Sequence, residues 1–394
     1  MILDHQTFLT DEIQDFINQN LKVNFAELAL KKNPFPSINY PEIINQIVAK
    51  SKSKEKLPTW FNTKGIAYPN KISIEQTSSE ITAKYKASLI KGDKIIDLSG
   101  GFGVDAYYFA KVFKEVYHCE MNKQLSQTVS HNYSVLNLKN IHCLNDDSLD
   151  VLKQLNTKFD WIYVDPSRRS DLKGKVFLLK DCVPNVPELL KNYFNFSNNI
   201  LIKTAPLLDI TLGLSELQFV KKIHIIAVKN EIKELLWEIE KDYLGLISIA
   251  SVNIENEVIH RLETVYRKEY NTSFSLPKTY LYEPNSSIMK SGNMDALSED
   301  KALYKLHQHS HIFTSDKITA FQGRRFQIDK IMSFQKEDMK PFMNQKINCT
   351  TRNFPLSVEE IKKKYKIKDG GNIFAFFTTN INNEKIVLIC TKIK

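Results

Sequence analysis

A glycine-rich turn is the first strong chemical signal in the chain. Residues 95–105 are typical of a strand that leads through a turn into a helix. Gly101 and Gly103 let the backbone approach a ligand closely, and the start of the helix offers unpaired N–H groups. A small charged cofactor fits such a turn. With Ala106, however, the spacing also matches the relaxed dinucleotide fingerprint, so the turn alone leaves two cofactor classes open.

Acidic residues at the ends of three apolar runs distinguish the two classes. Asp97 can hold a ligand ammonium, Glu120 can accept from two ribose hydroxyls, and Asp147 can accept from an adenine amine. An ammonium, a ribose and an adenine, bound in this order along the chain, describe S-adenosylmethionine. A dinucleotide instead needs an open helix N-terminus for its pyrophosphate. Each carboxylate could instead only cap the next turn or helix. The predicted cofactor site comprises Asp97, Ser99, Gly101, Gly103, Glu120, Met121, Asp147, Ser148 and Asp165.

A fourth strand end, Asp165-Pro166, is the predicted catalytic position. Methyl transfer from a sulfonium needs no nucleophilic residue, because the donor is already activated; the protein must align the acceptor and handle one proton. Open α/β sheets place their sites at the carboxyl edge of the strands. The Asp165 carboxylate and the Pro166 carbonyl are both acceptors, so together they could hold an exocyclic amine. The alternative is that Asp-Pro only starts an ordinary turn.

A basic loop follows this position. Residues 167–175 contain four positive charges, and arginine and lysine side chains are the usual partners of phosphate groups. The alternative is that the arginines pair with acids of their own domain. The predicted substrate-binding residues are Ser167, Arg168, Arg169 and, as a lesser candidate at the edge of the fifth strand, Lys203.

The elements that must position these residues follow from the pattern after residue 93. Short apolar runs alternate there with amphipathic stretches, which indicates βαβ units around a parallel sheet covered on both faces. We therefore predict an α/β fold, a Rossmann-like doubly wound domain with a late antiparallel strand. The predicted strands are 94–98, 116–119, 141–144, 159–164, 200–203 and 223–228, and the predicted helices are 104–112, 123–136 and 149–155.

The segments on either side follow other patterns. The N-terminal segment is predicted to be helical, and residues 50–56 are interpreted as a solvated loop. In the tail, a helix at 357–365 precedes a glycine turn and two strand-like runs, 373–378 and 385–390. The predicted domains are helical 1–88, Rossmann-like 89–265, and two small α+β domains, 266–320 and 321–394.

Composition and charge narrow the classes of function. Of the 394 residues 42% are hydrophobic and 25% charged, which excludes disorder as the dominant state. No apolar run approaches the roughly 18 residues that span a bilayer, so a soluble, cytoplasmic protein is expected. Residues 321–394 carry 15 basic and 7 acidic residues, nearly the whole net charge of +9, and can attract polyanions. Five scattered cysteines without a C-x-x-C pair predict neither disulfides nor a metal site.

With these residues the chain resembles class I S-adenosylmethionine-dependent methyltransferases over residues 75–253. It is also similar to a bacterial set of these enzymes that adds a ferredoxin-like domain and a THUMP-like domain at the C-terminus. The stretches that carry the second resemblance are 75–83 and 229–235 in the methyltransferase part, 280–285 and 314–316 in the ferredoxin-like part, and 352–355 and 369–371 in the THUMP-like part.

The resemblance implies methyl transfer to a base of structured RNA such as tRNA or rRNA, because THUMP-type domains are RNA-binding accessories. An exocyclic amine is the favoured acceptor. One departure from the family concerns Ser167 and Arg168, which stand where amine-methylating relatives carry a second proline and an aromatic residue; a guanidinium can also stack on a base. Two alternatives remain: a protein or small-molecule acceptor, and a non-catalytic RNA-binding protein with the same fold.

Overall fold

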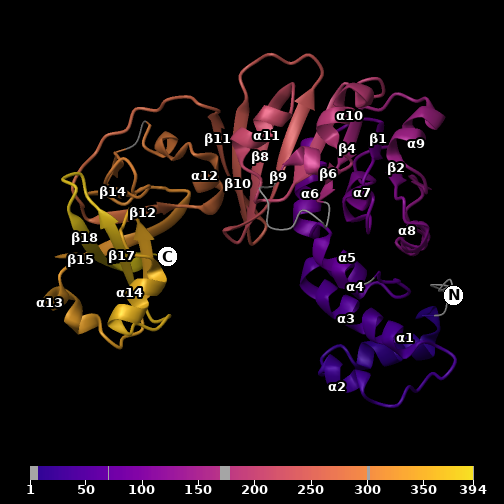
Figure 1. Ribbon diagram of the computed structural model, residues 1–394, viewed down its shortest axis with the longest axis horizontal. Helices are drawn as coiled ribbons and strands as arrows, with labels where there is room; N and C mark the ends of the chain where they lie inside the picture. The colour runs from indigo at the N-terminus through magenta and orange to yellow at the C-terminus, as the bar shows by residue number, and fades with distance from the viewer. Residues whose placement is uncertain (1–7, 70, 169–177, 300–301, 394) are drawn as a thin grey trace. The chain divides into compact units, whose positions relative to one another are not determined.

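The computed structural model describes residues 8–69, 71–168, 178–299 and 302–393, and Figure 1 shows its elements. The chain divides into two compact units. The N-terminal unit comprises Met1–Lys221 with Lys233–Gly245, and the C-terminal unit comprises Lys222–Ile232 with Leu246–Lys394. No helix in the described ranges is long and apolar enough to cross a bilayer.

The first part of the N-terminal unit is helical, as predicted. Ile17 of the first helix and Ile47 of the third pack into one buried core. The interpretation of residues 50–56 as a solvated loop is wrong: they continue the third helix, because Ala49 and Ser53, four residues apart, are both fully buried on one helix face. The helices are α1 (Asp11–Gln19), α2 (Phe25–Ala29), α3 (Tyr40–Lys56), α4 (Pro58–Asn62), α5 (Lys71–Gln76) and α6 (Glu80–Leu89).

A mostly parallel sheet forms the centre of the same unit, which confirms the predicted α/β fold. β1 pairs in parallel with β2 and β4, β2 with β3, and β4 with β7, whereas β9 is antiparallel to β7. Ile95 and Ile96 of β1 are both fully buried, as expected of a strand covered on both faces. The strands are β1 (Lys94–Asp97), β2 (Glu115–Cys119), β3 (Ile141–Leu144), β4 (Trp161–Val164), β7 (Asn199–Thr204) and β9 (Glu231–Glu240), and the helices are α7 (Val104–Phe109), α8 (Lys123–Val135), α9 (Ser148–Leu155), α10 (Val186–Tyr193) and α11 (Ile210–Glu216).

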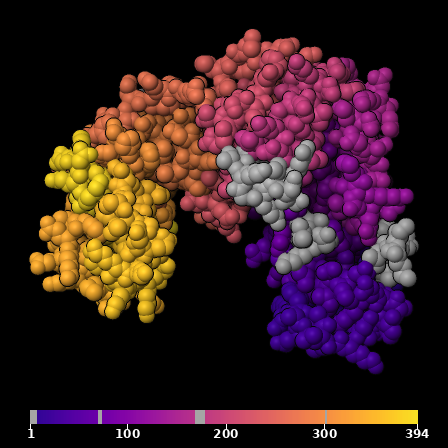
Figure 2. All heavy atoms as spheres, viewed as in Figure 1, coloured from indigo at the N-terminus to yellow at the C-terminus, as the bar shows by residue number. Residues whose placement is uncertain are grey.

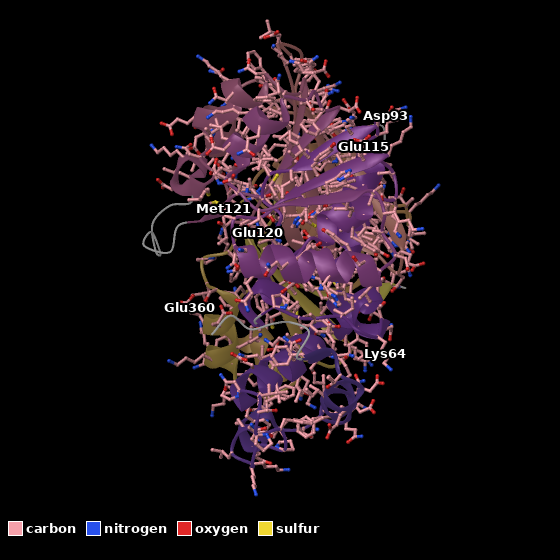
Figure 3. The ribbon with its side chains drawn as sticks, turned by 90° about the vertical axis from the view of Figure 1, so that its right-hand side faces the viewer. Lys64, Asp93, Glu115, Glu120, Met121 and Glu360 are labelled. Atoms are coloured by element: carbon pink, nitrogen blue, oxygen red, sulfur yellow. The ribbon has the colours of Figure 1, made fainter. Side chains whose placement is uncertain are left out.

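This topology brings the carboxyl ends of β1, β2 and β4 to one edge of the sheet. Asp97, the last residue of β1, is in register with His118 on β2 and with Tyr163 on β4. Figure 3 shows Glu120 and Met121 at this end of β2, away from Asp93 and Glu115 near the starts of β1 and β2. The strand ends that the sequence predicts as a site are therefore neighbours in the fold.

The C-terminal unit contains two groups of strands. β10 is parallel to β8 and antiparallel to β11. A separate seven-stranded sheet has the order β13-β14-β12-β15-β18-β17-β16. The strands are β8 (Val220–Val228), β10 (Ser248–Glu255), β11 (Val258–Val265), β12 (Tyr280–Pro284), β13 (Tyr304–Lys305), β14 (Phe313–Ser315), β15 (Gly323–Ser333), β16 (Asn348–Arg352), β17 (Ile373–Thr379) and β18 (Lys385–Ile393), and the helices are α12 (Ser286–Ser291), α13 (Lys336–Met339) and α14 (Val358–Tyr365).

The seven-stranded sheet joins the two parts of the tail. β15 pairs with both β12 and β18, and in the space-filling view the orange and yellow atoms of this region form one continuous body (Figure 2). Phe376 packs with Leu281 in one core of this sheet, and Phe377 packs with Ile361 of α14 in another. Ser357 begins α14 with a capping box, as the helix predicted at 357–365 requires.

Candidate active site

The glycine turn between β1 and α7 has the geometry that only glycine adopts easily. Gly101 and Gly103 have φ angles of +55° and +75°, in the left-handed region. A Cβ on Gly103 would lie 2.0 Å from the hydroxyl oxygen of Tyr133. That hydroxyl donates to the carbonyl of Gly103 over 2.8 Å, so a buried tyrosine holds the turn in place.

Ser99 connects the ends of β1 and β4. Its backbone N–H and its hydroxyl both donate to Oδ1 of Asp97, over 2.9 Å and 3.1 Å. Its hydroxyl oxygen accepts from the backbone N–H of Asp165 over 2.6 Å. Asp97 is 2% exposed, and burial raises the pKa of its carboxyl to about 8 in spite of the bonds from Ser99. The carboxyl group of Asp97 is thus poised near neutral pH.

Glu120 connects the end of β2 to the glycine turn. Its Oε2 accepts from the backbone N–H of Gly101 over 2.9 Å, and its Oε1 accepts from that of Asn122 over 2.7 Å. The following residue, Met121, has 66% of its surface exposed. Each oxygen of Glu120 keeps a lone pair beyond these two bonds, so the side chain can accept from a ligand as well.

Asp147 is the N-cap of α9. Such a cap is the alternative that the sequence leaves open to a cofactor-binding role for this carboxylate. Its Oδ1 accepts from the backbone N–H groups of Leu149 and Asp150 over 2.9 Å and 3.4 Å. Ser148 is the buried first residue of this helix. The cap fixes the direction of the Asp147 side chain, and Oδ2 makes neither of these two bonds.

Asp165 forms an ion pair that the sequence did not reveal. Its Oδ2 lies 2.5 Å from Nζ of Lys203, which projects from the neighbouring strand β7. Pro166, the next residue, is buried. The backbone then continues into a short strand, β5 (Ser167–Arg168), which pairs with β6 (Cys182–Val183). Most of the predicted basic loop, residues 169–175 with Arg169 among them, lies outside the described residues.

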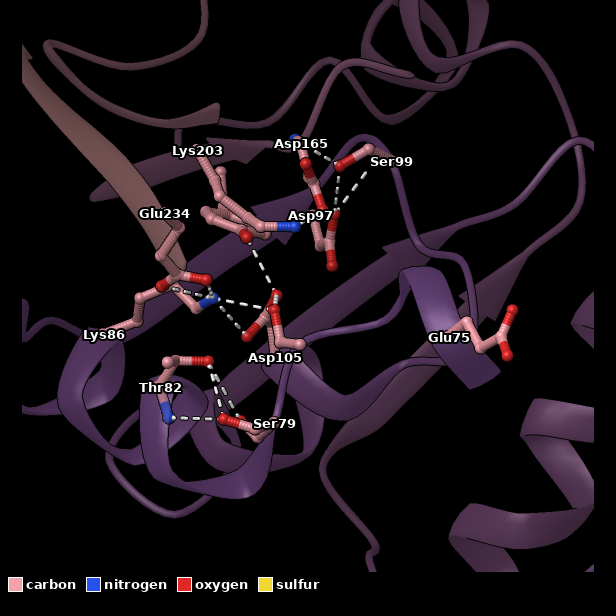
Figure 4. Close-up of polar contacts among 12 residues, drawn as sticks. Glu75, Ser79, Thr82, Lys86, Asp97, Ser99, Asp105, Asp165, Lys203 and Glu234 are labelled. Carbon is pink, nitrogen blue, oxygen red and sulfur yellow. Dashed lines mark hydrogen bonds and ion pairs between the residues drawn. The ribbon is translucent and has the colours of Figure 1, made fainter. Parts of the chain in front are cut away.

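A buried cluster of charges beneath this edge was also missed. Lys86 of α6 is fully buried, and its Nζ lies 3.0 Å from Asp105 of α7 and 3.0 Å from both carboxylate oxygens of Glu234 on β9. Asp105 also accepts from the hydroxyls of Ser78 and Tyr163, each over 2.8 Å. Figure 4 shows this cluster beside the Asp97, Asp165 and Lys203 side chains.

The Lys86 cluster brings together two stretches that are distant in the sequence, 75–83 and 229–235. Ser78 belongs to the first stretch and Glu234 to the second, and both contact the same ammonium group. The sequence holds a weak signal for this cluster, because Lys86 stands among small apolar residues, Ala83 and Ala87, on one face of α6. The structure shows that this face is buried. The partner could not be identified from sequence, since Lys86 and Glu234 are 148 residues apart.

Comparisons with known proteins match the two parts of the tail to domain families. Residues 280–321 match the model of a ferredoxin-like domain, and residues 323–392 match the model of a THUMP-like domain. These matches confirm both predicted resemblances in the tail.

Two relatives extend the comparison to the rest of the chain. A crystal structure of a protein from Porphyromonas gingivalis W83, provisionally named a methyltransferase, superposes with a TM-score of 0.87 and 27% identity, and the match covers 100% of both chains. An uncharacterized RNA methyltransferase of Mycoplasma mobile is 26% identical over 145 residues, which are 34% of this chain and 39% of that protein. The match therefore spans well under half of the curated relative. The chain is thus similar over its whole length to a protein named as a methyltransferase, as the sequence predicts, and its C-terminal part matches a ferredoxin-like and a THUMP-like domain.

Proposed function

We propose that this protein transfers a methyl group from S-adenosylmethionine to a base of structured RNA, such as tRNA or rRNA. The observation that carries the proposal is the joining of three strand ends at one edge of the sheet. Glu120 binds the glycine turn, and Ser99 binds both Asp97 and Asp165. A fold that only bound RNA would not need this connected set of acids.

The residues at this edge suit the cofactor. Asp97 is a buried carboxyl group with a pKa of about 8, raised by burial, and the ammonium of the cofactor would supply the positive charge that stabilises its ionised form. Glu120 accepts from the ribose hydroxyls and Oδ2 of Asp147 from the adenine amine, while Gly101 and Gly103 let the backbone approach the ligand. Ser99, Met121 and Ser148 complete the surroundings. When bound, S-adenosylmethionine supplies an activated methyl group.

The acceptor is held by the end of β4 in this proposal. The Asp165 carboxylate and the Pro166 carbonyl would orient the base for transfer, and Asp165 would receive the proton that the base loses. Ser167, Arg168 and Arg169 follow directly in the chain and contact the phosphate or the plane of the base. The THUMP-like match, the name of the Mycoplasma relative and the +8 charge of residues 321–394 favour RNA over a protein or a small molecule as the acceptor.

Isothermal titration with S-adenosylmethionine tests the cofactor site. We expect the wild type to bind and Asp97→Asn to bind at least about tenfold more weakly, because a charged hydrogen-bond partner of the ammonium is lost. Asp93→Asn is the matched control, since Asp93 immediately precedes the opposite end of β1 and pairs there with Lys114 in an exposed ion pair. No binding by the wild type, or equal binding by both variants, would refute the site.

Nucleoside mass spectrometry tests the acceptor. RNA and protein from cells that lack the gene are incubated with the purified protein and labelled cofactor. We expect the label in one modified nucleoside of RNA. Label in protein alone would establish the protein-acceptor alternative, and cofactor binding without any transfer would favour the non-catalytic one.

A further inference from the structure

The ion pair between Asp165 and Lys203 changes what the acceptor site can recognise. Lys203 has 13% of its side chain exposed and Asp165 has 32%, so the pair lies at the boundary between the core and the site edge. Burial lowers the pKa of the Lys203 ammonium, but the charges of Asp165, Glu234 and Asp105 outweigh it, and the pKa is raised overall. Lys203 is therefore a permanent cation beside the predicted catalytic carboxylate (Figure 4).

A cation at this place disfavours an exocyclic amine as the acceptor. An amine nitrogen that attacks a methyl group gains positive charge before its proton leaves, and the Lys203 ammonium repels that charge. An amine itself offers only donors toward Asp165 and Pro166, so Lys203 could bind only an adjacent ring nitrogen, which takes up no negative charge when a neutral amine attacks the methyl group. Lys203 has three N–H donors, and Asp165 uses one of them, which leaves donors for a ligand oxygen.

A lactam edge, in which a ring N–H adjoins a carbonyl, matches both members of the pair. The ring N–H donates to Asp165, and the carbonyl oxygen accepts from Lys203. When the nitrogen loses its proton, the negative charge moves onto that oxygen, where a fixed ammonium stabilises it. Guanine presents such an edge at N1 and O6, and uracil presents one at N3 and O4.

We propose that the methyl acceptor is the ring nitrogen of a nucleobase lactam, N1 of guanine or N3 of uracil, and that Lys203 binds the adjacent carbonyl oxygen. The inference rests on the proposed function. The nitrogen lone pair forms the new N–C bond, and the electrons of the broken C–S bond stay on sulfur, which becomes a neutral thioether. The ring proton passes to the Asp165 carboxylate and then to water. The methylated base is neutral, so charge and atoms balance.

The identity of the product tests this inference directly. After incubation of the full-length protein with labelled S-adenosylmethionine and RNA from cells that lack the gene, we expect N1-methylguanosine or N3-methyluridine. N2-methylguanosine, N6-methyladenosine or N4-methylcytidine would overturn the lactam inference and leave the proposed function intact. No methylated nucleoside in RNA would overturn the proposed function and this inference with it.

Variants of Lys203 test its role. We expect Lys203→Met to lower kcat by about 100-fold or more, as removal of an oxyanion donor does, and to change the Kd of S-adenosylmethionine less than about threefold. Lys203→Arg keeps a cation and should recover part of the loss, which also guards against a variant that merely fails to fold. Lys191→Met, on the exposed surface of α10, is the control and should leave kcat unchanged. A loss of cofactor affinity as large as the loss of kcat would assign Lys203 to the cofactor and overturn the inference.

Discussion

Two carboxylates at strand ends, Asp165 in the N-terminal unit and Glu283 in the C-terminal unit, differ in how completely they are bound. Glu283 on β12 is 5% exposed and has an arginine on each oxygen: Oε1 accepts from Arg352 over 2.8 Å and Oε2 accepts from Nε of Arg324 over 2.6 Å. Asp165 has a cation on Oδ2 alone and keeps 32% of its side chain exposed.

The difference separates a structural charge from one that can act on a ligand. A carboxylate with both oxygens bound by forked guanidinium groups is fixed, and it stabilises the strands that carry its partners. A carboxylate with one oxygen bound and part of its surface exposed is positioned without being saturated. The same contrast holds beneath the site, where the fully buried Lys86 cluster resembles Glu283 rather than Asp165.

The largest effect should come from Lys86. Lys86→Met leaves Glu234 and Asp105 buried without their cation, so we expect the free energy of unfolding to fall by about 3–5 kcal/mol. Chemical denaturation measures it. The exposed Lys111→Met on the loop after α7 is a control that should change it by less than about 0.5 kcal/mol. If Lys86→Met were as stable as the wild type, the buried cluster would not be a structural one.

Replacing Asp165 should affect methyl transfer strongly and the free energy of unfolding only slightly. Asp165→Asn removes the proton acceptor, so we expect methyl transfer to RNA to fall by about 100-fold or more. The free energy of unfolding should fall by only about 1 kcal/mol, because the pair is partly exposed to solvent and Lys203 keeps the charges of Glu234 and Asp105 nearby. Single-turnover kinetics and denaturation of the same preparation measure both. Full activity in this variant would remove Asp165 from the reaction.

Asp97 connects the site to pH. Its folded pKa of about 8, raised by burial, lies above the ordinary value of 3.8, so the protonated form favours folding. That contribution is complete below about pH 4 and is lost as the pH rises to 8. Relative to Asp97→Asn, the free energy of unfolding of the wild type should fall by up to about 1.4 kcal/mol for each unit by which the pH rises in that window. Denaturation at pH 5, 6 and 7 measures the difference, and a difference that does not vary with pH would contradict the buried, poised carboxyl.

The smallest effect should come from Glu283. Arg324 and Arg352 are each about a third exposed and can turn to water, so Glu283→Gln should lower the free energy of unfolding by about 1–2 kcal/mol. The affinity for S-adenosylmethionine should not change. The exposed Glu337→Gln on α13 is the control. A weaker affinity for the cofactor in Glu283→Gln would break the distinction between the two carboxylates.

Much of the fold could be predicted because local patterns encode it. Apolar runs near residues 94–98, 116–119 and 141–144 coincide with β1, β2 and β3. A strand buried on both faces, such as β1, must be apolar throughout, whereas β3 ends the strand order and keeps His142 exposed.

The interpretation of residues 50–56 as a loop is wrong because no local apolar pattern marks them as part of a helix. The first half of α3 buries isoleucines such as Ile47, but the second half carries long polar side chains and buries only Ala49, Lys50 and Ser53, so no apolar stripe reveals that the helix continues. The predicted domain boundaries stay a prediction.

Some features of the candidate site could likewise be predicted from the sequence, and others could not. The glycine turn and the acids at four strand ends follow from sequence, because parallel strands place their carboxyl ends on one edge whatever the details of packing. The bond from Ser99 to Asp165 and the ion pair of Asp165 with Lys203 do not, since each joins residues on different strands. The roles predicted for the cofactor and substrate residues remain proposals.

The sequence by itself determined the fold class, the glycine turn, the order of the acids and the basic character of the tail, because these depend on residue type and local period. Only the tertiary structure decided which charges meet. Ion pairs such as Asp165 with Lys203, or Lys86 with Glu234, need two groups within a few ångströms, and the register of neighbouring strands and the packing of helices on them set that distance. Pairing decides whether a buried carboxylate is saturated or can still bind a ligand, so the chemistry of this site depends on the structure as well as on the residues.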